Sequence, residues 1–149
     1  MVKVNKILFP CDFSENVSKV LPYVLSIARK YDSQVYIVYV NDLQRWGGQF
    51  IPQTTVDRLQ QDALVAAEEA MEQMCEEEMQ SCPSFKRMIV AGDPATEILK
   101  LVKSEDIDMV IMGTHGRKGV EHAIFGSVAE NVVKKSSVPV LVVHPDAAK

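Results

Sequence analysis

Residues 108–127 read DMVIMGTHGRKGVEHAIFGS, and this stretch decides the fold of the chain. The apolar run that precedes Gly113 is typical of a strand buried on both faces of a sheet. Gly113 and Gly116 then lie in a predicted loop, and Gly126-Ser127 begins a segment with helical spacing that runs to Lys135. A buried strand, a glycine-rich loop and a helix, in this order, are one repeat of an α/β protein.

Strands and helices alternate in the same way over the rest of the chain. Ser14 is the expected N-cap of the first helix, which contains Pro22 and is predicted to kink there. Asp93 is the expected N-cap of the third helix, with Pro94 in its first turn. We predict strands at 6–10, 34–40, 85–91, 108–112 and 139–144, and helices at 17–31, from Thr54 or Thr55 to Met79, at 94–102 and at 127–135. This alternation predicts one open parallel sheet with helices on both faces, and one domain over residues 1–149.

Composition places the chain among ordinary globular proteins. It has 149 residues, of which 47% are hydrophobic and 24% charged, and this excludes a disordered or fibrous protein. The longest aliphatic runs are too short to cross a bilayer, and the N-terminus lacks the apolar core of a signal peptide. The three cysteines (Cys11, Cys75 and Cys82) form no CxxC pair and fit a reducing compartment. We therefore expect a cytoplasmic protein that does not bind membranes.

The negative charge is concentrated in one segment. The net charge is −4, but residues 55–82 contain eight acids against one base, so this segment is −7 and the remainder is +3. We interpret the acidic segment as the solvated face of a helix. The overall acidity argues against a nucleic-acid partner, whereas it leaves room for a local anion site elsewhere.

The ends of the predicted strands are the natural place for a ligand site, because open α/β sheets bind ligands beyond the carboxyl ends of their strands. Glycines let backbone N–H groups approach an anion, and a helix N-terminus adds free N–H groups and a partial positive charge. Two such clusters, at Gly113 and at Gly126-Ser127, fit a di- or triphosphate; the alternative is a plain turn and a helix cap. The sequence contains neither a Walker A motif nor a dinucleotide fingerprint.

The glycine spacing resembles the signature of a known family. Gly113-x2-Gly116-x9-Gly126-Ser127 is similar to the nucleotide motif of the universal stress protein family. The blocks Ile7–Glu15, Gly92–Ala95 and Val138–Val143 match the family in the same order along nearly the whole chain. The resemblance implies the strand order 3-2-1-4-5, a Rossmann-like sheet, and ATP bound across the ends of the first and fourth strands.

The resemblance also implies roles for individual residues. Asp12 would accept hydrogen bonds from the ribose hydroxyls, Pro10 would line the adenosine pocket, and the backbone of Val40 would bind the adenine edge. The phosphates would be held by Gly113, Gly116, Gly126, Ser127 and the N–H of Val128. Cys11 and Tyr39 stand where the family often has threonine or valine and histidine, respectively. The ligand would be ATP, or AMP or ADP, with a divalent cation carried by the phosphates.

Several residues allow a second interpretation. His115, Arg117 and Lys118 lie inside the glycine loop and either neutralise phosphate charge or are solvated loop residues. Asp12 also fits a catalytic base, a metal ligand or a helix cap, although its position at a strand end favours ribose binding. The role of the Trp46-Gly47-Gly48 segment is left open.

These observations favour a nucleotide-dependent regulator with little or no hydrolysis. We find no placed base, arginine finger or Walker B carboxylate, so hydrolysis is expected to be slow. The alternatives are an ATPase or nucleotidyl-transferring enzyme that uses the same pocket, and a nucleotide-free interaction protein. The resemblance further implies a homodimer formed through the last strand, at Val140, Leu141, Val142 and Val143, an edge strand under the implied order.

Overall fold

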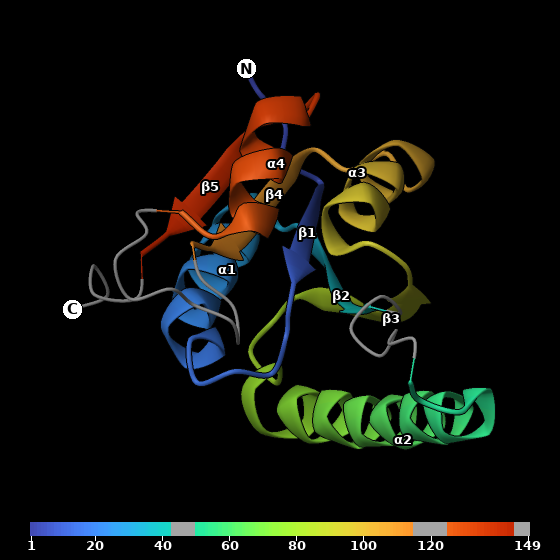
Figure 1. Ribbon diagram of the computed structural model, residues 1–149. Coiled ribbons are helices and arrows are strands. Elements are labelled where there is room, and N and C mark those ends of the chain that lie inside the picture. Colours follow the sequence, from blue (N-terminus) through green and yellow to red (C-terminus); the bar gives the residue numbers. More distant parts are fainter. Residues whose placement is uncertain (43–49, 115–124, 145–149) are drawn as a thin grey trace.

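The sheet has the predicted strand order. The computed structural model describes residues 1–42, 50–114 and 125–144. The strands are β1 (Lys6–Pro10), β2 (Gln34–Asn41), β3 (Ser84–Ala91), β4 (Met109–Gly113) and β5 (Val140–Val143). The helices are α1 (Val17–Tyr31), α2 (Gln53–Glu78), α3 (Pro94–Ser104) and α4 (Ser127–Lys135). All neighbouring strands are parallel, in the order β3-β2-β1-β4-β5 (Figure 1). The predicted fold class is confirmed.

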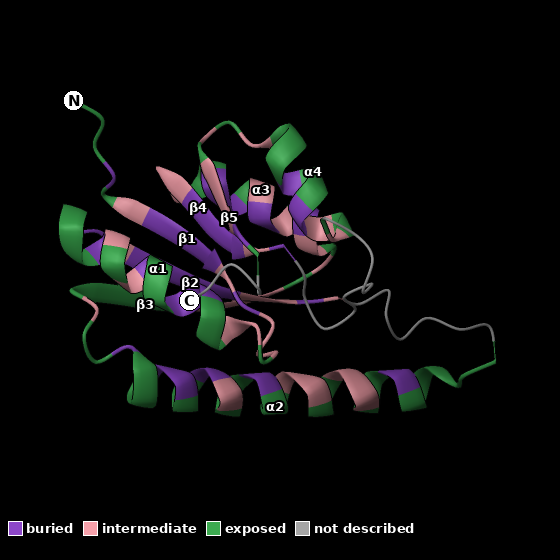
Figure 2. Cartoon of the chain, turned by 90° about the vertical axis from the view of Figure 1, so that its left-hand side faces the viewer, coloured by how far each residue is buried: buried purple, intermediate pink, exposed green. Residues whose placement is uncertain are grey.

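Helices cover both faces of the sheet and form two separate cores. Strand β1 lies in the middle, and its side chains alternate between the faces, as the period of a strand requires. Ile7 and Phe9 pack with α1 and α2 on one face, whereas Leu8 packs with α3 and α4 on the other. The helices of the two layers are seen on either side of the sheet in Figure 2. All three side chains are at most 1% exposed. The buried central strand therefore fixes its carboxyl end, at Pro10, between the two helical layers.

Helix α2 is long and only partly supported by the sheet (Figure 2). Its C-terminal half buries Met71, Met74 and Cys75 in the core, and Met79 follows at its C-cap. The eight acids between residues 55 and 82 are all exposed, which confirms the solvated acidic face. No helix among the described residues is long and apolar enough to span a bilayer.

The helix starts show one clear error of the sequence prediction. Helix α1 begins at Val17 with Asn16 at the N-cap position, so Ser14 does not cap it. The physical reason is Phe13, whose φ of 58° turns the chain before the helix begins. Helix α2 starts at Gln53, one residue before the earlier of the two predicted starts.

The third helix starts as predicted. Asp93 is the N-cap of α3, and its carboxylate accepts from Thr96 N at 3.0 Å and from Thr96 Oγ1 at 2.7 Å. Pro94 occupies the first turn, where its missing N–H costs no hydrogen bond. Pro22 is retained inside α1, which runs unbroken from Val17 to Tyr31.

Candidate functional site

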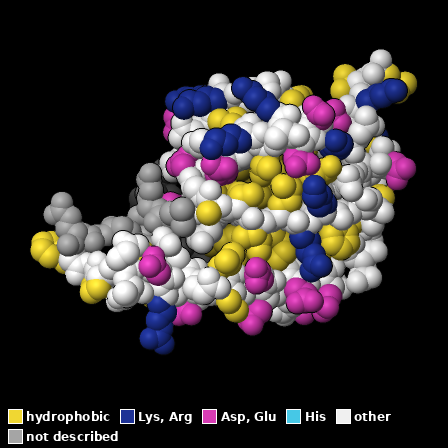
Figure 3. All heavy atoms as spheres, turned by 90° about the vertical axis from the view of Figure 1, so that its right-hand side faces the viewer, with side chains coloured by type: hydrophobic (Ala, Val, Ile, Leu, Met, Phe, Trp, Pro, Cys, Tyr) yellow, Lys and Arg dark blue, Asp and Glu magenta, His cyan; other side chains and the backbone are white. Residues whose placement is uncertain are grey.

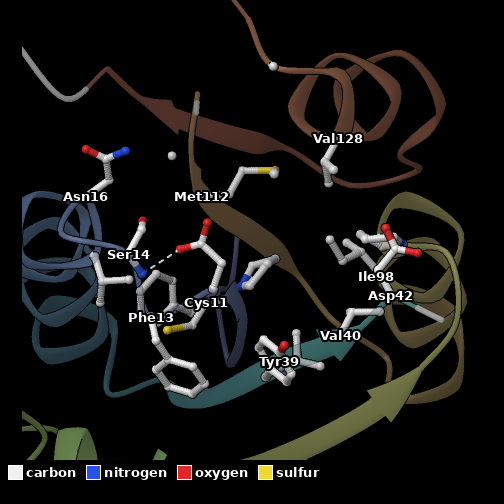
Figure 4. A pocket seen from close by; sticks show the side chains of 18 of the residues that line it. Cys11, Phe13, Ser14, Asn16, Tyr39, Val40, Asp42, Ile98, Met112 and Val128 are labelled. Atoms are coloured by element: carbon white, nitrogen blue, oxygen red, sulfur yellow. Dashed lines mark hydrogen bonds between the residues drawn. The ribbon is translucent and has the colours of Figure 1, made fainter. Parts of the chain in front are cut away.

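A cavity of about 510 Å³ opens at the carboxyl ends of β1, β2 and β4 (Figure 4). Its walls come from the segment after β1, the end of β2, the segment after β4, one face of α2, and the first turns of α3 and α4. The cavity therefore reaches both helical layers. It lies at the edge where an open parallel sheet binds ligands.

The glycine loop is closed at its base. Gly126 N–H donates to the Thr114 carbonyl at 2.7 Å, and Thr114 N–H donates to the Val143 carbonyl of β5 at 3.1 Å. Gly113 and Gly126 are thus brought to one place although thirteen positions separate them in the sequence. Both glycines line the cavity.

The start of α4 presents N–H groups to this cavity. The first hydrogen bond within the helix runs from Glu130 N–H to the Gly126 carbonyl, at 3.0 Å. Helical geometry therefore leaves the N–H groups of Ser127, Val128 and Ala129 without a partner inside the helix. All three residues line the cavity, and unpaired N–H groups at a helix start favour an anion.

The backbone N–H of Gly126 is bonded within the protein. Its N–H is already bonded to Thr114, so it is not an available donor to a phosphate. Its backbone angles, φ −71° and ψ 161°, are extended and open to any residue. What glycine provides at this position is the absence of a side chain beside the N-terminus of α4.

The segment after β1 supplies the polar wall of the cavity. One carboxylate oxygen of Asp12 accepts from Ser14 N–H at 3.0 Å, the bond drawn in Figure 4. Asp12, Ser14 and Asn16 all line the cavity. The Ser14 Oγ atom is buried and has no hydrogen-bond partner among the described residues. Asp12 thus organises the segment that precedes α1 but does not cap the helix itself.

Another part of the cavity wall is apolar. The rings of Phe13 and Tyr39 stack with a centroid distance of 5.4 Å, and Val40 lies beside Tyr39 at the end of β2. Helix α2 contributes four alanines to the same wall: Ala63, Ala66, Ala67 and Ala70. A flat ligand with apolar faces suits a wall of this kind.

Cys11 is a structural residue at the floor of the cavity. Its side chain is 5% exposed, and its Sγ lies 3.8 Å from Met74 Sδ. Burial raises the pKa of the Cys11 thiol to about 12, so the thiol stays protonated at neutral pH. No group of three or more His, Cys, Asp or Glu side chains in the described ranges is arranged to hold a metal ion.

Most of the predicted site residues meet in this cavity. Seven of them line it: Pro10, Asp12, Val40, Gly113, Gly126, Ser127 and Val128. Gly116, the loop residues His115, Arg117 and Lys118, and the Trp46-Gly47-Gly48 segment lie outside the described residues. The sequence reasoning missed Ser14, Asn16, the Phe13–Tyr39 pair and the alanines of α2. Ser14 follows a strand end, which was a signal, but the same residue also fits a helix cap.

Comparison with known proteins identifies the family. The universal stress protein family matches residues 3–144. The chain belongs to this family. The universal stress protein MJ0577 of Methanocaldococcus jannaschii is 32% identical over 155 residues, which cover 95% of this chain and 96% of the relative. The solved structure of MJ0577 superposes with a TM-score of 0.85 and 34% identity, over 96% of this chain and 97% of that one.

Two more distant universal stress proteins were solved with nucleotides. One is a complex with cAMP, at a TM-score of 0.69 and 17% identity, over 96% of this chain and 98% of that one. The other, from Archaeoglobus fulgidus, is a complex with dAMP, at a TM-score of 0.66 and 18% identity, over 95% and 98% of the two chains. At these identities the similarity to the present chain extends to the fold alone.

Proposed function

We propose that this universal stress protein binds ATP, or AMP or ADP, in the cavity at the carboxyl ends of β1, β2 and β4. The observation that carries the proposal is the meeting of two kinds of group in one cavity. N–H groups that have no partner within the helix begin α4, and the Asp12 carboxylate lies on the segment after β1. A phosphate chain suits the first and a sugar bearing hydroxyl groups suits the second.

Each residue takes a role that its surroundings support. The N–H groups of Ser127 and Val128 and the Ser127 hydroxyl bind phosphate, and Gly113 and Gly126 leave room for it. Asp12 accepts from the ribose, while Pro10 and the backbone of Val40 contact the adenosine. The stacked rings of Phe13 and Tyr39 form the apolar wall next to Val40. Gly116 completes the phosphate site in this proposal, on the strength of the signature spacing.

The nucleotide complexes of the distant family members support an adenine nucleotide as the ligand class. A divalent cation accompanies the phosphates, because Mg²⁺ is commonly held by phosphate oxygens and water with few protein ligands. The cation is thus part of the ligand and not a protein metal centre.

The test is direct. The protein is purified without added nucleotide and denatured, and the supernatant is chromatographed for adenine nucleotides. In parallel, nucleotide-free protein is heated with and without Mg-ATP; a ligand at 100 times its dissociation constant stabilises the folded state by about 2.7 kcal/mol. Absence of both released nucleotide and thermal stabilisation by ATP, ADP or AMP refutes the proposal and favours a nucleotide-free interaction protein.

In our proposal the bound nucleotide regulates contacts with a partner protein and is hydrolysed slowly or not at all. The alternative, an ATPase or nucleotidyl-transferring enzyme, uses the same cavity. Steady-state product formation separates them, since ordinary enzymes turn over at about 1–1000 per second. Turnover in that range by purified protein, lost on substitution of Asp12, decides for the enzyme.

We also propose a cytoplasmic homodimer that forms through β5. The carbonyls of Pro139 and Val143 accept from Val110 of β4 and from Thr114, which follows β4. The alternate backbone groups, at Val140 and Val142, therefore point away from β4 at the open edge of the sheet. The other edge strand, β3, carries exposed Lys86 and Arg87, which disfavour pairing with another chain. Figure 3 views the side of the molecule where β3 and α3 lie, with charged side chains around its apolar area.

Sedimentation of the purified protein over a wide concentration range tests the dimer. A monomer at all concentrations, with and without nucleotide, refutes it. The proposal of a cytoplasmic location rests on the three cysteines, whose free thiols fit a reducing compartment.

A further inference from the structure

Among the described residues, one buried polar atom in the cavity wall stands out. The Oγ of Ser14 has essentially no contact with solvent and no hydrogen-bond partner among the described residues. A buried hydroxyl without a partner costs about 1–3 kcal/mol, so such atoms are rare in folded proteins and call for an explanation. Ser14 lies in the wall of the candidate nucleotide site, where a ligand atom can supply the missing partner (Figure 4).

The Asp12 carboxylate, next to this hydroxyl, limits which kind of ligand atom can be the missing partner. Ser14 N–H donates to Asp12 Oδ1 at 3.0 Å, so the serine hydroxyl and the carboxylate belong to one short turn. A phosphate oxygen beside Asp12 meets like charge and is disfavoured. A ligand hydroxyl is neutral and can donate to the carboxylate while its oxygen accepts from Ser14 Oγ–H.

We propose that Ser14 and Asp12 together recognise one hydroxyl of the ribose, and that Ser14 thereby makes the site selective for a ribonucleotide over the corresponding deoxynucleotide. This inference rests on the proposed function, and it adds a residue and a specificity to it. Sites that hydrogen-bond a substrate hydroxyl reject the analogue that lacks it, because their buried polar groups are then left unpaired. The family member that was solved in complex with dAMP is only 18% identical to this chain, so it does not bear on the specificity proposed here.

The experiment is a thermodynamic cycle in which the contact is removed either by deleting the Ser14 hydroxyl or by deleting one hydroxyl of the ribose. The affinities of AMP, 2′-deoxy-AMP and 3′-deoxy-AMP are measured by calorimetry for the wild type and for Ser14→Ala. We expect the substitution to weaken AMP about tenfold, which corresponds to about 1.4 kcal/mol. For the deoxynucleotide that lacks the contacted hydroxyl, wild type and variant should bind about equally, because the contact is already absent. The other deoxynucleotide should lose about as much as AMP.

The unliganded protein supplies a second readout. A serine with a structural role loses stability on truncation, whereas removal of an unpartnered buried hydroxyl leaves stability unchanged or increases it. We therefore expect Ser14→Ala to unfold at the same temperature as the wild type or higher without ligand, and to bind AMP more weakly. Ser18→Ala is the matched control: its hydroxyl donates to the Glu15 carbonyl at 2.8 Å, on an exposed residue outside the cavity. It should leave all three affinities unchanged.

The outcomes separate the two proposals. If the wild type binds none of the three nucleotides and no ATP, both the proposed function and this inference are wrong. If AMP binds, but Ser14→Ala weakens AMP and both deoxynucleotides by the same factor, or weakens none of them, only the role of Ser14 is overturned. A lower unfolding temperature of the unliganded variant would assign Ser14 to the fold and also overturn the inference.

Discussion

Substitution of Asp12 separates its two tasks. One carboxylate oxygen accepts from Ser14 N–H within the protein, and we assign the carboxylate to the ribose as well. Asp12→Asn keeps one carbonyl oxygen for Ser14 N–H but removes the charge and replaces the second acceptor by a donor. Asp12→Ala removes both acceptors. Comparison of the two variants therefore separates the contribution of Asp12 to the stability of the free protein from its contribution to ligand affinity.

The expected magnitudes follow from these contacts. Hydrogen bonds to a charged group contribute about 1.5–3 kcal/mol, so either variant should weaken nucleotide binding about 10- to 150-fold. Without ligand, Asp12→Ala leaves the Ser14 N–H without its acceptor and should lose about 1 kcal/mol of stability. Asp12→Asn should lose less, because Ser14 keeps a partner.

Calorimetric titration with adenosine and with Mg-ATP measures the binding part, and thermal unfolding of the free protein measures the structural part. A ribose contact is common to both ligands, so adenosine and ATP should lose affinity by the same factor. An effect confined to ATP would show that Asp12 acts on the phosphates or on the cation. Unchanged binding of both ligands to Asp12→Asn refutes the assignment of this carboxylate to the ligand.

Three further predictions concern glycines and a helix cap. Gly126→Val should abolish ATP binding, because it places a branched side chain at the start of α4. The backbone there (φ −71°) accepts valine, so circular dichroism should show a folded protein. Unchanged ATP affinity contradicts the role of this glycine. Gly92→Ala should lower the free energy of unfolding in urea by about 1–2 kcal/mol, because φ is +146° and a Cβ would lie 2.8 Å from Glu97 atoms. A variant as stable as the wild type contradicts the strain expected at this position. Hydrogen bonds from Thr96 lower the pKa of Asp93, so its carboxylate stabilises the fold above the pKa of an unfolded aspartate and loses this effect as the pH falls through the lower, folded value. Asp93→Ala should therefore cost about 0.5–2 kcal/mol at pH 7 and less below about pH 4, and a cost that does not change with pH excludes this explanation.

The sheet could be predicted from sequence because its signals are local and repeated. A buried strand such as β4 reads as an unbroken apolar run, and Asp93-Pro94 combines a side-chain acceptor with a residue that tolerates the first helical turn. The family resemblance then implied the strand order. Both kinds of signal depend on residue type and spacing alone, and neither needs the position of a distant side chain.

The details of the site could not be predicted, because they depend on contacts between distant segments or on an unusual backbone angle. Phe13 adopts a φ of 58°, a conformation in which an aromatic residue is rare, and this displaces the start of α1 and leaves Ser14 in the cavity. Gly126 donates to Thr114, a bond between two segments that the sequence separates by a loop. The alanines of α2 recur with helical spacing whether they face a cavity or a packed core.

Thr114 connects the nucleotide site to the edge strand β5. Its N–H donates to the Val143 carbonyl of β5, and its carbonyl accepts from the Gly126 N–H at the start of α4. Two hydrogen bonds, of 3.1 and 2.7 Å, thus link β5 to the start of α4, where the residues assigned to phosphate binding lie. If a second copy of the chain pairs with β5, the dimer contact and the nucleotide site are joined by one residue, and coupling between two binding equilibria is reciprocal. Nucleotide should then shift the dimerisation constant by the same factor by which dimerisation shifts the nucleotide affinity. Such coupling is a physical route by which a bound nucleotide can act as a signal without being hydrolysed.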